Sequence, residues 1–342
     1  MDDRRALMAA ILADPGEDTP RLALADWLDE HGDARDRARA EFIRLQCELA
    51  RLPEDAKKTP AHKRSEALHK KHLLAWLGSL APLNSMHEFT RGLLAHWYCT
   101  TQEFLKKDHQ RALAERLPLV GAHTLLLSGP TARAGAVAGS AALEWFAELC
   151  WLGGKLDDDG LGELARSPCG ARLSRVLLSD LRCTNAGLTA LAKSAAFPNL
   201  RTIGLRADSP RVAYTHRGVL RVLESDRFPK LESLDLLDRP PAGFNQRLFY
   251  NEPALSRVRA YWAPNGGDTA ALCRCRRLTN LEALRISGST VTDDDVRALL
   301  DNPAFAKLKV LELWGNNPTG SQLSEAVMDR LRQRFGASLS AQ

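Results

Sequence analysis

The sequence predicts an α/β solenoid, with the strands of a parallel sheet on its concave side and helices on its convex side, preceded by a small all-α domain. One hydrophobic pattern recurs through most of the chain: an apolar residue, two further residues, an aliphatic, one residue and another aliphatic. A stretch with helical spacing follows most copies. The first 80 residues, by contrast, have helical periodicity without this repeat. Strand–helix repeats of this kind stack on one another, because each repeat buries its apolar face only against its neighbours.

Four stretches of apolar residues at helical spacing predict four helices in residues 1–80, around positions 7–12, 22–28, 42–52 and 68–77. Asp14-Pro15 ends the first stretch, and His31-Gly32 ends the second as a C-cap. Residues 53–60 are rich in proline and charge and are expected to form a loop.

Eight copies of the repeat pattern begin at residues 122, 146, 173, 200, 231, 255, 281 and 308, which are 24 to 31 residues apart. In the clearest copy, Leu173, Val176 and Leu178 come before a Gly-Leu-x-x-Leu-Ala stretch. Aliphatics two residues apart lie on one face of a short strand, whereas the following stretch has the spacing of a helix. Prolines at positions 168, 198, 229 and 303 fall where each helix must stop before the next strand.

This array resembles leucine-rich repeat proteins of the longer, helix-backed kind similar to ribonuclease inhibitor, over about 220 residues. The resemblance implies a horseshoe over residues 81–342, with a capping helix at about 321–335. The family favours Asn at the eighth position after each start, where its amide ties neighbouring turns together. Only Asn316 keeps it here, and the other copies carry Gly154, Leu181, Asp208, Arg239, Ala263 and Ser289. We therefore expect less regular turns than in a consensus array.

The N-terminal region resembles the bacterial repeat-companion domain, a helical module placed ahead of leucine-rich repeats. Three blocks carry the resemblance in order: residues 13–22, residues 25–33 and residues 40–46. The strand that begins at Arg91-Gly92-Leu93-Leu94, with the helix after it, looks like the opening repeat of such proteins, at about 88–121. The resemblance implies an architecture, with residues 1–80 as the helical domain, and it implies no biochemical activity.

Composition narrows the class of protein further. Hydrophobic residues make up 44% of the chain and charged residues 26%, which excludes wholesale disorder. No apolar run approaches the roughly 18 residues that span a bilayer. The seven cysteines are odd in number and scattered, which favours a reducing cytoplasm over a disulfide framework. A net charge of +5 permits a polyanionic partner without predicting one.

No residue cluster in the sequence indicates catalysis, a cofactor or a metal site. Cys273 and Cys275 lack the spacing of a zinc site, and Lys70 and Lys71 disfavour a cation between His69 and His72. The triplets Asp157–Asp159 and Asp293–Asp295 begin repeat helices, where carboxylates cap free N–H groups. The nucleophile, metalloprotease and phosphate-loop motifs are absent from the sequence. We therefore expect a protein that is not an enzyme.

The predicted concave face supplies the candidate binding residues. In a solenoid, residues between the buried aliphatics of each strand point into this face. Its later repeats carry the Arg, Tyr and Trp side chains that provide most binding energy at interfaces. The candidates are Arg206, Asp235, Arg257, Arg259, Tyr261, Trp262, Arg285, Glu312 and Trp314. An alternative is that Asp235 pairs with Arg259 and Arg285 with Glu312, but exposed pairs contribute only about 0–1 kcal/mol each and leave the aromatics unexplained.

The leading hypothesis is a cytoplasmic bacterial scaffold that binds a protein partner on this face. A second hypothesis is a nucleic-acid-binding adaptor, because the stretch at 57–72 contains Lys57, Lys58, Lys63, Arg64, Lys70 and Lys71 against a single Glu66. It lacks the aromatics that stack single-stranded bases. A third hypothesis is an inhibitor or regulated substrate of an enzyme in a stress or defence pathway, contacted or cleaved at 53–60 or 239–251.

Overall fold

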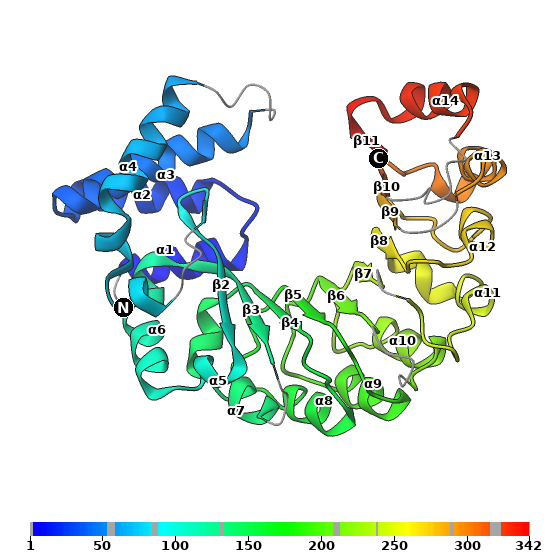
Figure 1. Cartoon of the computed structure of the whole chain (residues 1–342), viewed down its shortest axis with the longest axis horizontal. Helices are drawn as coiled ribbons and strands as arrows, with labels where there is room; N and C mark the ends of the chain where they lie inside the picture. Colours follow the sequence, from blue (N-terminus) through cyan, green and yellow to red (C-terminus); the bar gives the residue numbers. More distant parts are fainter. Residues whose placement is uncertain are drawn as a thin grey trace. The chain divides into compact units, whose positions relative to one another are not determined.

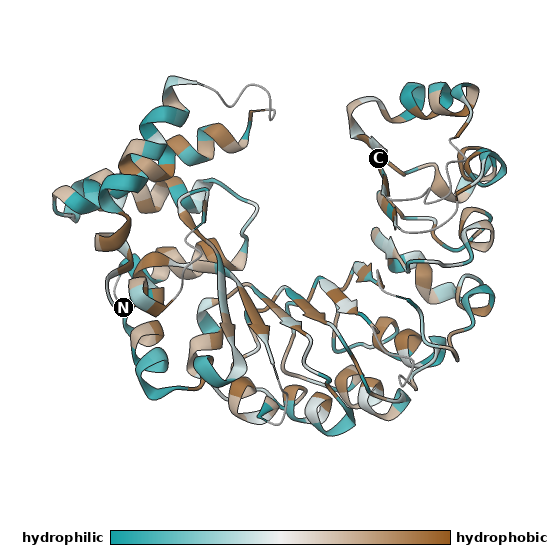
Figure 2. Cartoon of the chain, viewed as in Figure 1, coloured by the Kyte–Doolittle hydropathy of each residue, from teal (hydrophilic) through white to brown (hydrophobic). Residues whose placement is uncertain are grey.

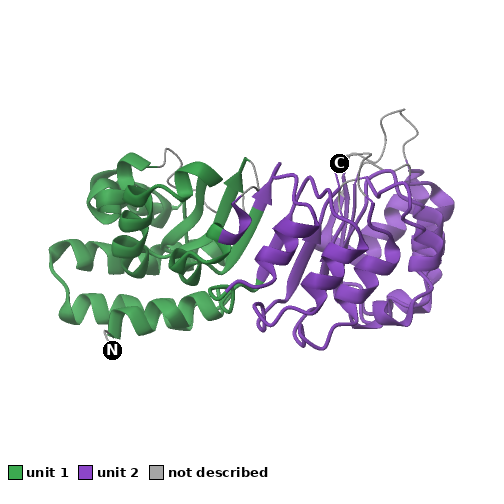
Figure 3. Ribbon diagram, turned by 90° about the horizontal axis from the view of Figure 1, so that it is seen from below, with its two compact units in different colours: residues 1–129, 136–150, 168–174 green, residues 130–135, 151–167, 175–342 purple. Residues whose placement is uncertain are grey.

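The computed structural model describes residues 3–52, 59–83, 88–129, 133–207, 213–236, 239–287, 291–314 and 323–341. These residues form two compact units (Figure 3). Unit 1 comprises residues 1–129, 136–150 and 168–174, and unit 2 comprises residues 130–135, 151–167 and 175–342. Lys57, Lys58, most of the predicted 53–60 loop and Asn316 lie outside the described residues.

Unit 1 begins with the four predicted helices, which are α1 (Asp3–Ala13), α2 (Thr19–His31), α3 (Ala34–Ala50) and α4 (Pro60–Leu77). Their starts follow local chemistry. Asp33 accepts hydrogen bonds from the backbone N–H groups of Arg35 and Asp36, and Thr59 accepts one from His62. Each of these helices has both hydrophilic and hydrophobic residues (Figure 2), and the hydrophobic ones form the core.

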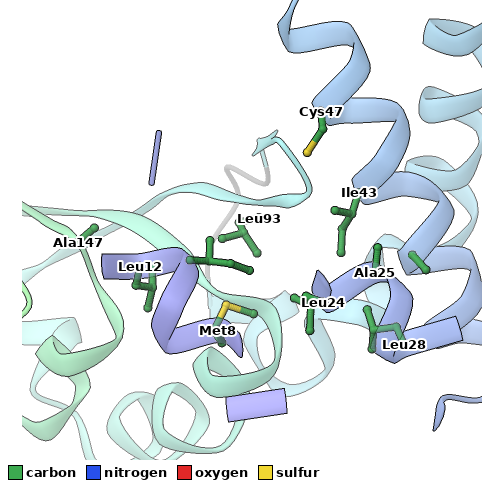
Figure 4. Packing of buried hydrophobic residues seen from close by; sticks show 11 residues of the cluster. Met8, Leu12, Leu24, Ala25, Leu28, Ile43, Cys47, Leu93 and Ala147 are labelled. Atoms are coloured by element: carbon green, nitrogen blue, oxygen red, sulfur yellow. The ribbon is translucent and has the colours of Figure 1, made fainter. Parts of the chain in front are cut away.

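The core of unit 1 joins these helices to the first strands. Met8, Leu24 and Ile43 are almost fully buried together with Leu93 from β2 (Leu93–Thr100) and Ala147 (Figure 4). A second cluster encloses a cation. The Arg39 guanidinium lies 4.6 Å from the Phe89 ring centroid and 4.8 Å from that of Trp76, and burial lowers its pKa to about 9.

The strands of unit 1 lie in chain order. β1 (Phe89–Thr90) pairs antiparallel with β2, and β2 pairs parallel with β3 (Ala122–Ser128). Short helix α5 (Thr101–Phe104) and helix α6 (Lys107–Val120) connect β2 to β3. Helix α7 (Ala134–Ala138) follows β3 in the chain, and the division between the units falls inside β4 (Glu148–Leu152).

Unit 2 repeats the predicted alternation of strand and helix (Figure 1). Its strands are β5 (Arg175–Leu178), β6 (Thr202–Leu205), β7 (Ser233–Asp235), β8 (Ala260–Ala263), β9 (Ala283–Ser287), β10 (Val310–Trp314) and β11 (Leu339–Ala341). All paired neighbours from β5 to β11 are parallel. The predicted α/β solenoid is confirmed.

The helices of unit 2 lie on one side of these strands and leave the other side open (Figure 1). They are α8 (Asp158–Leu164), α9 (Asn185–Ala192), α10 (His216–Leu223), α11 (Gln246–Phe249), α12 (Thr269–Cys273), α13 (Asp293–Asp301) and the C-terminal α14 (Glu325–Phe335). We call the uncovered side the open sheet face. No helix of the described ranges combines the length and the apolar character that crossing a membrane requires.

One repeat start was predicted wrongly. Six strands begin two residues after the predicted starts at 146, 173, 200, 231, 281 and 308, but β8 begins at Ala260, five residues after Leu255. Leu255 is buried in the 3₁₀ segment Pro253–Arg257, and Leu234 pairs with Tyr261 in the sheet. The pattern in this repeat therefore starts at Val258, three residues later than predicted.

Side chains at the helix starts tie one repeat to the next. Asp158 Oδ1 accepts hydrogen bonds of 2.8 Å from the backbone N–H groups of Thr184 and Gly187. At the equivalent position in the following repeat, Asn185 Oδ1 accepts one of 2.9 Å from Thr215. Near the C-terminus, Asp293 Oδ1 accepts one of 3.0 Å from Ser324. These contacts join successive repeats, although most of the turns lack the Asn that leucine-rich repeat proteins favour. Asp157, as expected, caps α8 by accepting a hydrogen bond from Gly160.

Candidate functional site

Four of the predicted binding residues form one row across the open sheet face of unit 2. In the strand register, Asp235 of β7 pairs with Trp262 of β8, Trp262 pairs with Arg285 of β9, and Arg285 pairs with Glu312 of β10. Neighbouring strands are about 4.8 Å apart, so the register places these four residues side by side. Trp262, Arg285 and Glu312 are partly exposed, whereas Asp235 is only 1% exposed.

At the β10 end of the row, charge and aromatic contacts combine. Arg285 Nε lies 3.4 Å from Glu312 Oε2, which confirms the pairing weighed above for these two residues. The Arg285 guanidinium carbon is also 5.5 Å from the centre of the Trp314 ring, and the indole N–H of Trp314 donates to Glu312 at 3.3 Å. The three side chains hold one another in place while part of each stays exposed.

Asp235 is neutralised by Arg206 rather than by Arg259. The guanidinium of Arg206 donates to both carboxylate oxygens, at 3.1 Å and 2.6 Å. This carboxylate is buried. Loss of Arg206 would therefore leave the Asp235 charge out of water without a partner, which destabilises the fold. Arg206 therefore has a structural role in addition to its place beside the row.

Tyr261 does not lie on the open sheet face, and its prediction as a surface residue is wrong. It is 1% exposed and packs into the core, where its hydroxyl lies 3.4 Å from that of Tyr250. Burial raises the pKa of the Tyr261 phenol well above its usual value. The error follows from the three-residue shift of the repeat start, because the shift exchanges inward and outward positions of a strand.

Arg257 is likewise not on the strand. It ends the 3₁₀ segment Pro253–Arg257, and its guanidinium donates to the carbonyl oxygens of Leu223 and Phe228, the latter at 2.7 Å. Leu223 is the last residue of α10, where carbonyls lack intrahelical partners. Arg334 makes the same pair of contacts, to Leu300 and Phe305, at the same sequence offsets. Arg257 thus supports the end of a helix, and its assignment to the binding row is corrected.

Arg259 belongs to a second row, at the start of each strand. This charge ladder consists of Arg201, Glu232, Arg259, Glu282 and Lys309, with opposite charges alternating from one repeat to the next. Lys309 and Arg259 both donate to Glu282, and these bonds lower its carboxyl pKa to about 2. The Arg259 side chain is 55% exposed, so this member of the charge ladder remains accessible.

The basic helix proposed for polyanions is α4. Lys63, Lys70 and Lys71 are exposed, as is Leu74 on the same helix, which is 69% exposed. Arg64 is engaged: its guanidinium donates to both oxygens of Glu41, at 2.7 Å and 2.8 Å. His69 and His72 stack on Phe42 and Trp76 respectively, so they contact aromatic rings rather than solvent alone.

The cysteines lie in the core. None of the seven forms a disulfide and all are buried, and burial raises the pKa of the Cys273 thiol to about 12. Within the described ranges, no three His, Cys, Asp or Glu residues are grouped so that they could hold a metal ion. Cys273 and Cys275 are among the buried residues of the core, at 1% and 4% exposure.

No protein-family model matches the sequence, and no curated protein matches it significantly. Among solved structures, a chain of the yeast Rad7–Elc1 complex is similar with 14% identity and a TM-score of 0.41, over 90% of this chain and 81% of that chain. A protein from Bacteroides fragilis is similar with 14% identity and a TM-score of 0.40, over 82% of this chain and 84% of that chain.

Proposed function

We propose that the protein is a non-enzymatic recognition or scaffold module whose open sheet face in unit 2 binds a protein partner. The observation that carries the proposal is the group of partly exposed side chains Trp262, Arg285, Glu312 and Trp314 on the paired parallel strands β8, β9 and β10. Arg259 lies at the edge of this surface, in the charge ladder.

The residue types support recognition of a protein. Tryptophan and arginine are the side chains most enriched at energetic centres of interfaces, because each combines a large apolar area with a polar group. Here the Arg285–Glu312 pair fixes the geometry of its neighbour Trp314 before any partner arrives. Side chains that are already ordered lose less entropy on binding, which favours affinity.

We further propose that the array belongs to the leucine-rich repeat class, with residues 1–80 as a repeat-companion helical domain and residues 81–342 as the repeat domain. This assignment rests on the repeat spacing and on the three N-terminal sequence blocks. On this assignment we expect the protein to be a scaffold in the bacterial cytoplasm.

Affinity purification with a tagged protein from its native host tests the binding face. The variant carries Trp262→Ala with Trp314→Ala, and a matched control carries Arg247→Ala with Leu248→Ala on α11, where Leu248 is 51% exposed. We expect partners that wild type and the control recover to be lost with the tryptophan variant, because truncating central aromatic residues costs about 2 kcal/mol or more each. Equal recovery by all three proteins contradicts the proposal.

A nucleic-acid partner for α4 is the second candidate, and the exposed Lys63, Lys70 and Lys71 favour it. The Arg64–Glu41 pair reduces the number of cations available for phosphates. If α4 binds nucleic acid, the affinity for a duplex oligonucleotide should fall steeply between 50 and 200 mM salt. A flat salt dependence rules this candidate out.

A further inference from the structure

Helices α9 and α10 lie side by side on the helix-covered side of unit 2, away from the open sheet face (Figure 1). Residues of these two helices line a cationic groove. It has a volume of about 670 Å³ and is lined by Asn185, Ala186, Thr189, Ala190, Lys193, Arg217 and Arg221. Three of these residues are basic, and no carboxylate lines the groove.

The sequence places these residues on facing sides of the two helices. Ala186, Thr189, Ala190 and Lys193 follow the spacing i, i+3, i+4 and i+7, which is one face of α9. Arg217 and Arg221 are four residues apart and form one stripe on α10. One helix therefore supplies a floor of small residues with a lysine at its end, and the other supplies two guanidinium groups.

Close packing keeps this floor fixed. Gly218 faces α9 so closely that a Cβ at this position would lie 2.4 Å from Asn185 Oδ1. The polar groups of the floor are already used within the fold. Asn185 bonds the backbone N–H of Thr215, and the Thr189 hydroxyl donates to the Asn185 carbonyl at 2.6 Å. The charged side chains are what remains to bind a ligand.

The described residues do not neutralise the three cations. Lys193, Arg217 and Arg221 have no carboxylate within 4.0 Å in the part of the chain that the structure describes. The repeat register explains this: the positions of Arg217 and Arg221 correspond to Ala186 and Ala190 on α9, where an acidic residue could have paired with them. Many other arginines of unit 2 do form ion pairs, as in the charge ladder.

We propose that this groove binds a short acidic segment of a protein. Residues four apart on a helix have Cβ atoms about 6 Å apart. Carboxylates at i and i+4 of a helix, or at i and i+2 of an extended strand, have a similar spacing. A segment with two or three such carboxylates would match Arg217, Arg221 and Lys193 in charge and spacing. Bidentate bonds from guanidinium groups to carboxylates add specificity.

The groove fits a peptide better than a nucleic acid. Its floor consists of alanine and threonine side chains, and it contains no aromatic residue on which a base could stack. The two helices that line the groove have eight residues each, so each is about 12 Å long. The groove offers three cations. This is enough for a few carboxylates but short for the phosphate contacts that stable nucleic-acid binding uses.

Binding of fluorescein-labelled hexaglutamate to the full chain at low salt tests the proposal, with hexaglutamine as the uncharged reference peptide. The groove variant is Arg217→Gln with Arg221→Gln. The matched control, Lys106→Gln with Lys107→Gln, removes the same charge from exposed positions in unit 1. Circular dichroism establishes that each variant is folded.

We expect hexaglutamate to bind wild type, to bind the groove variant about tenfold more weakly, and to bind the control within twofold of wild type. Equal weakening by both variants would mean that net charge alone attracts the peptide and would overturn the proposal. No binding of hexaglutamate to wild type would overturn it as well. A labelled single-stranded hexathymidine is run in parallel, and binding of this probe alone, lost in the groove variant, would assign the groove to phosphates instead.

Discussion

Tyr261 and Trp262 are neighbours in β8 and have opposite roles. Successive residues of a strand point to opposite faces, so one side chain enters the core while the other lies on the open sheet face. Tyr261 packs 6.3 Å from the Tyr250 ring and 6.5 Å from that of Phe249, whereas Trp262 remains partly exposed. A shift of register by one residue would exchange the two, and the core would then lose the Tyr261 ring and its contact with Tyr250.

Substitution of Tyr261 tests its role in the core. We expect Tyr261→Ala to lower the free energy of unfolding by about 3–5 kcal/mol, because it leaves a cavity the size of an aromatic ring. Tyr261→Phe should cost about 1 kcal/mol, since it removes only the hydroxyl contact with Tyr250. Urea unfolding followed by circular dichroism measures both. Nearly wild-type stability of the alanine variant would show that Tyr261 is not a core residue.

At the scale of the elements, the helix starts join the repeats. Asp158 is the first residue of α8, and its carboxylate binds the loop that begins α9. It also meets the Thr184 hydroxyl at 2.7 Å. The same carboxylate lies at the positive end of the α8 dipole. Gly187 makes this contact possible, because a Cβ there would lie 2.4 Å from Asp158 Oδ1.

Removal of this tie should destabilise unit 2. We expect Asp158→Ala to lower the free energy of unfolding by about 1–2 kcal/mol, because three donors lose their acceptor. Asp159→Ala is the matched control: Asp159 is the next residue of the same helix and is exposed, so its loss should change stability by less than about 0.5 kcal/mol. Thermal unfolding of both variants measures the difference. Equal effects would mean that charge near the helix start, rather than the tie, is what matters.

At the scale of the molecule, repetition made the fold predictable. Each copy of the pattern constrains the others, so one weak copy does not alter the predicted architecture. The site was less predictable, because the residues that face outward depend on the residue at which each copy of the pattern starts. A start at Leu255 fits the pattern with Val258 and Ala260, whereas a start at Val258 puts the aromatic Tyr261 at an aliphatic position. Only packing shows that Tyr261 is the buried residue. The ties made by Asp158 and Asn185 were missed for a similar reason: they join residues 26 and 30 positions apart, and no local motif marks them.

The C-terminal segment completes the apolar core of unit 2. Val327, Leu331 and Phe335 of α14 are buried, and Leu339 of β11 pairs with Leu311 of β10. A terminal repeat needs such a cap, because otherwise its apolar face and its strand edge meet water. The free edge of β10 would present unpaired N–H and C=O groups, on which another chain can add a strand.

Two truncations separate these effects. We expect a chain without residues 323–342 to unfold at a lower temperature and to self-associate, because it loses both the apolar cover from α14 and the pairing with β11. A chain without residues 336–342 keeps α14, so its midpoint should fall less, while the freed β10 edge still permits association. Calorimetry and size-exclusion chromatography with light scattering measure the two properties. If the longer truncation stayed monomeric with an unchanged midpoint, α14 and β11 would be dispensable, and the apolar face of the β10 repeat would have to be covered by other residues.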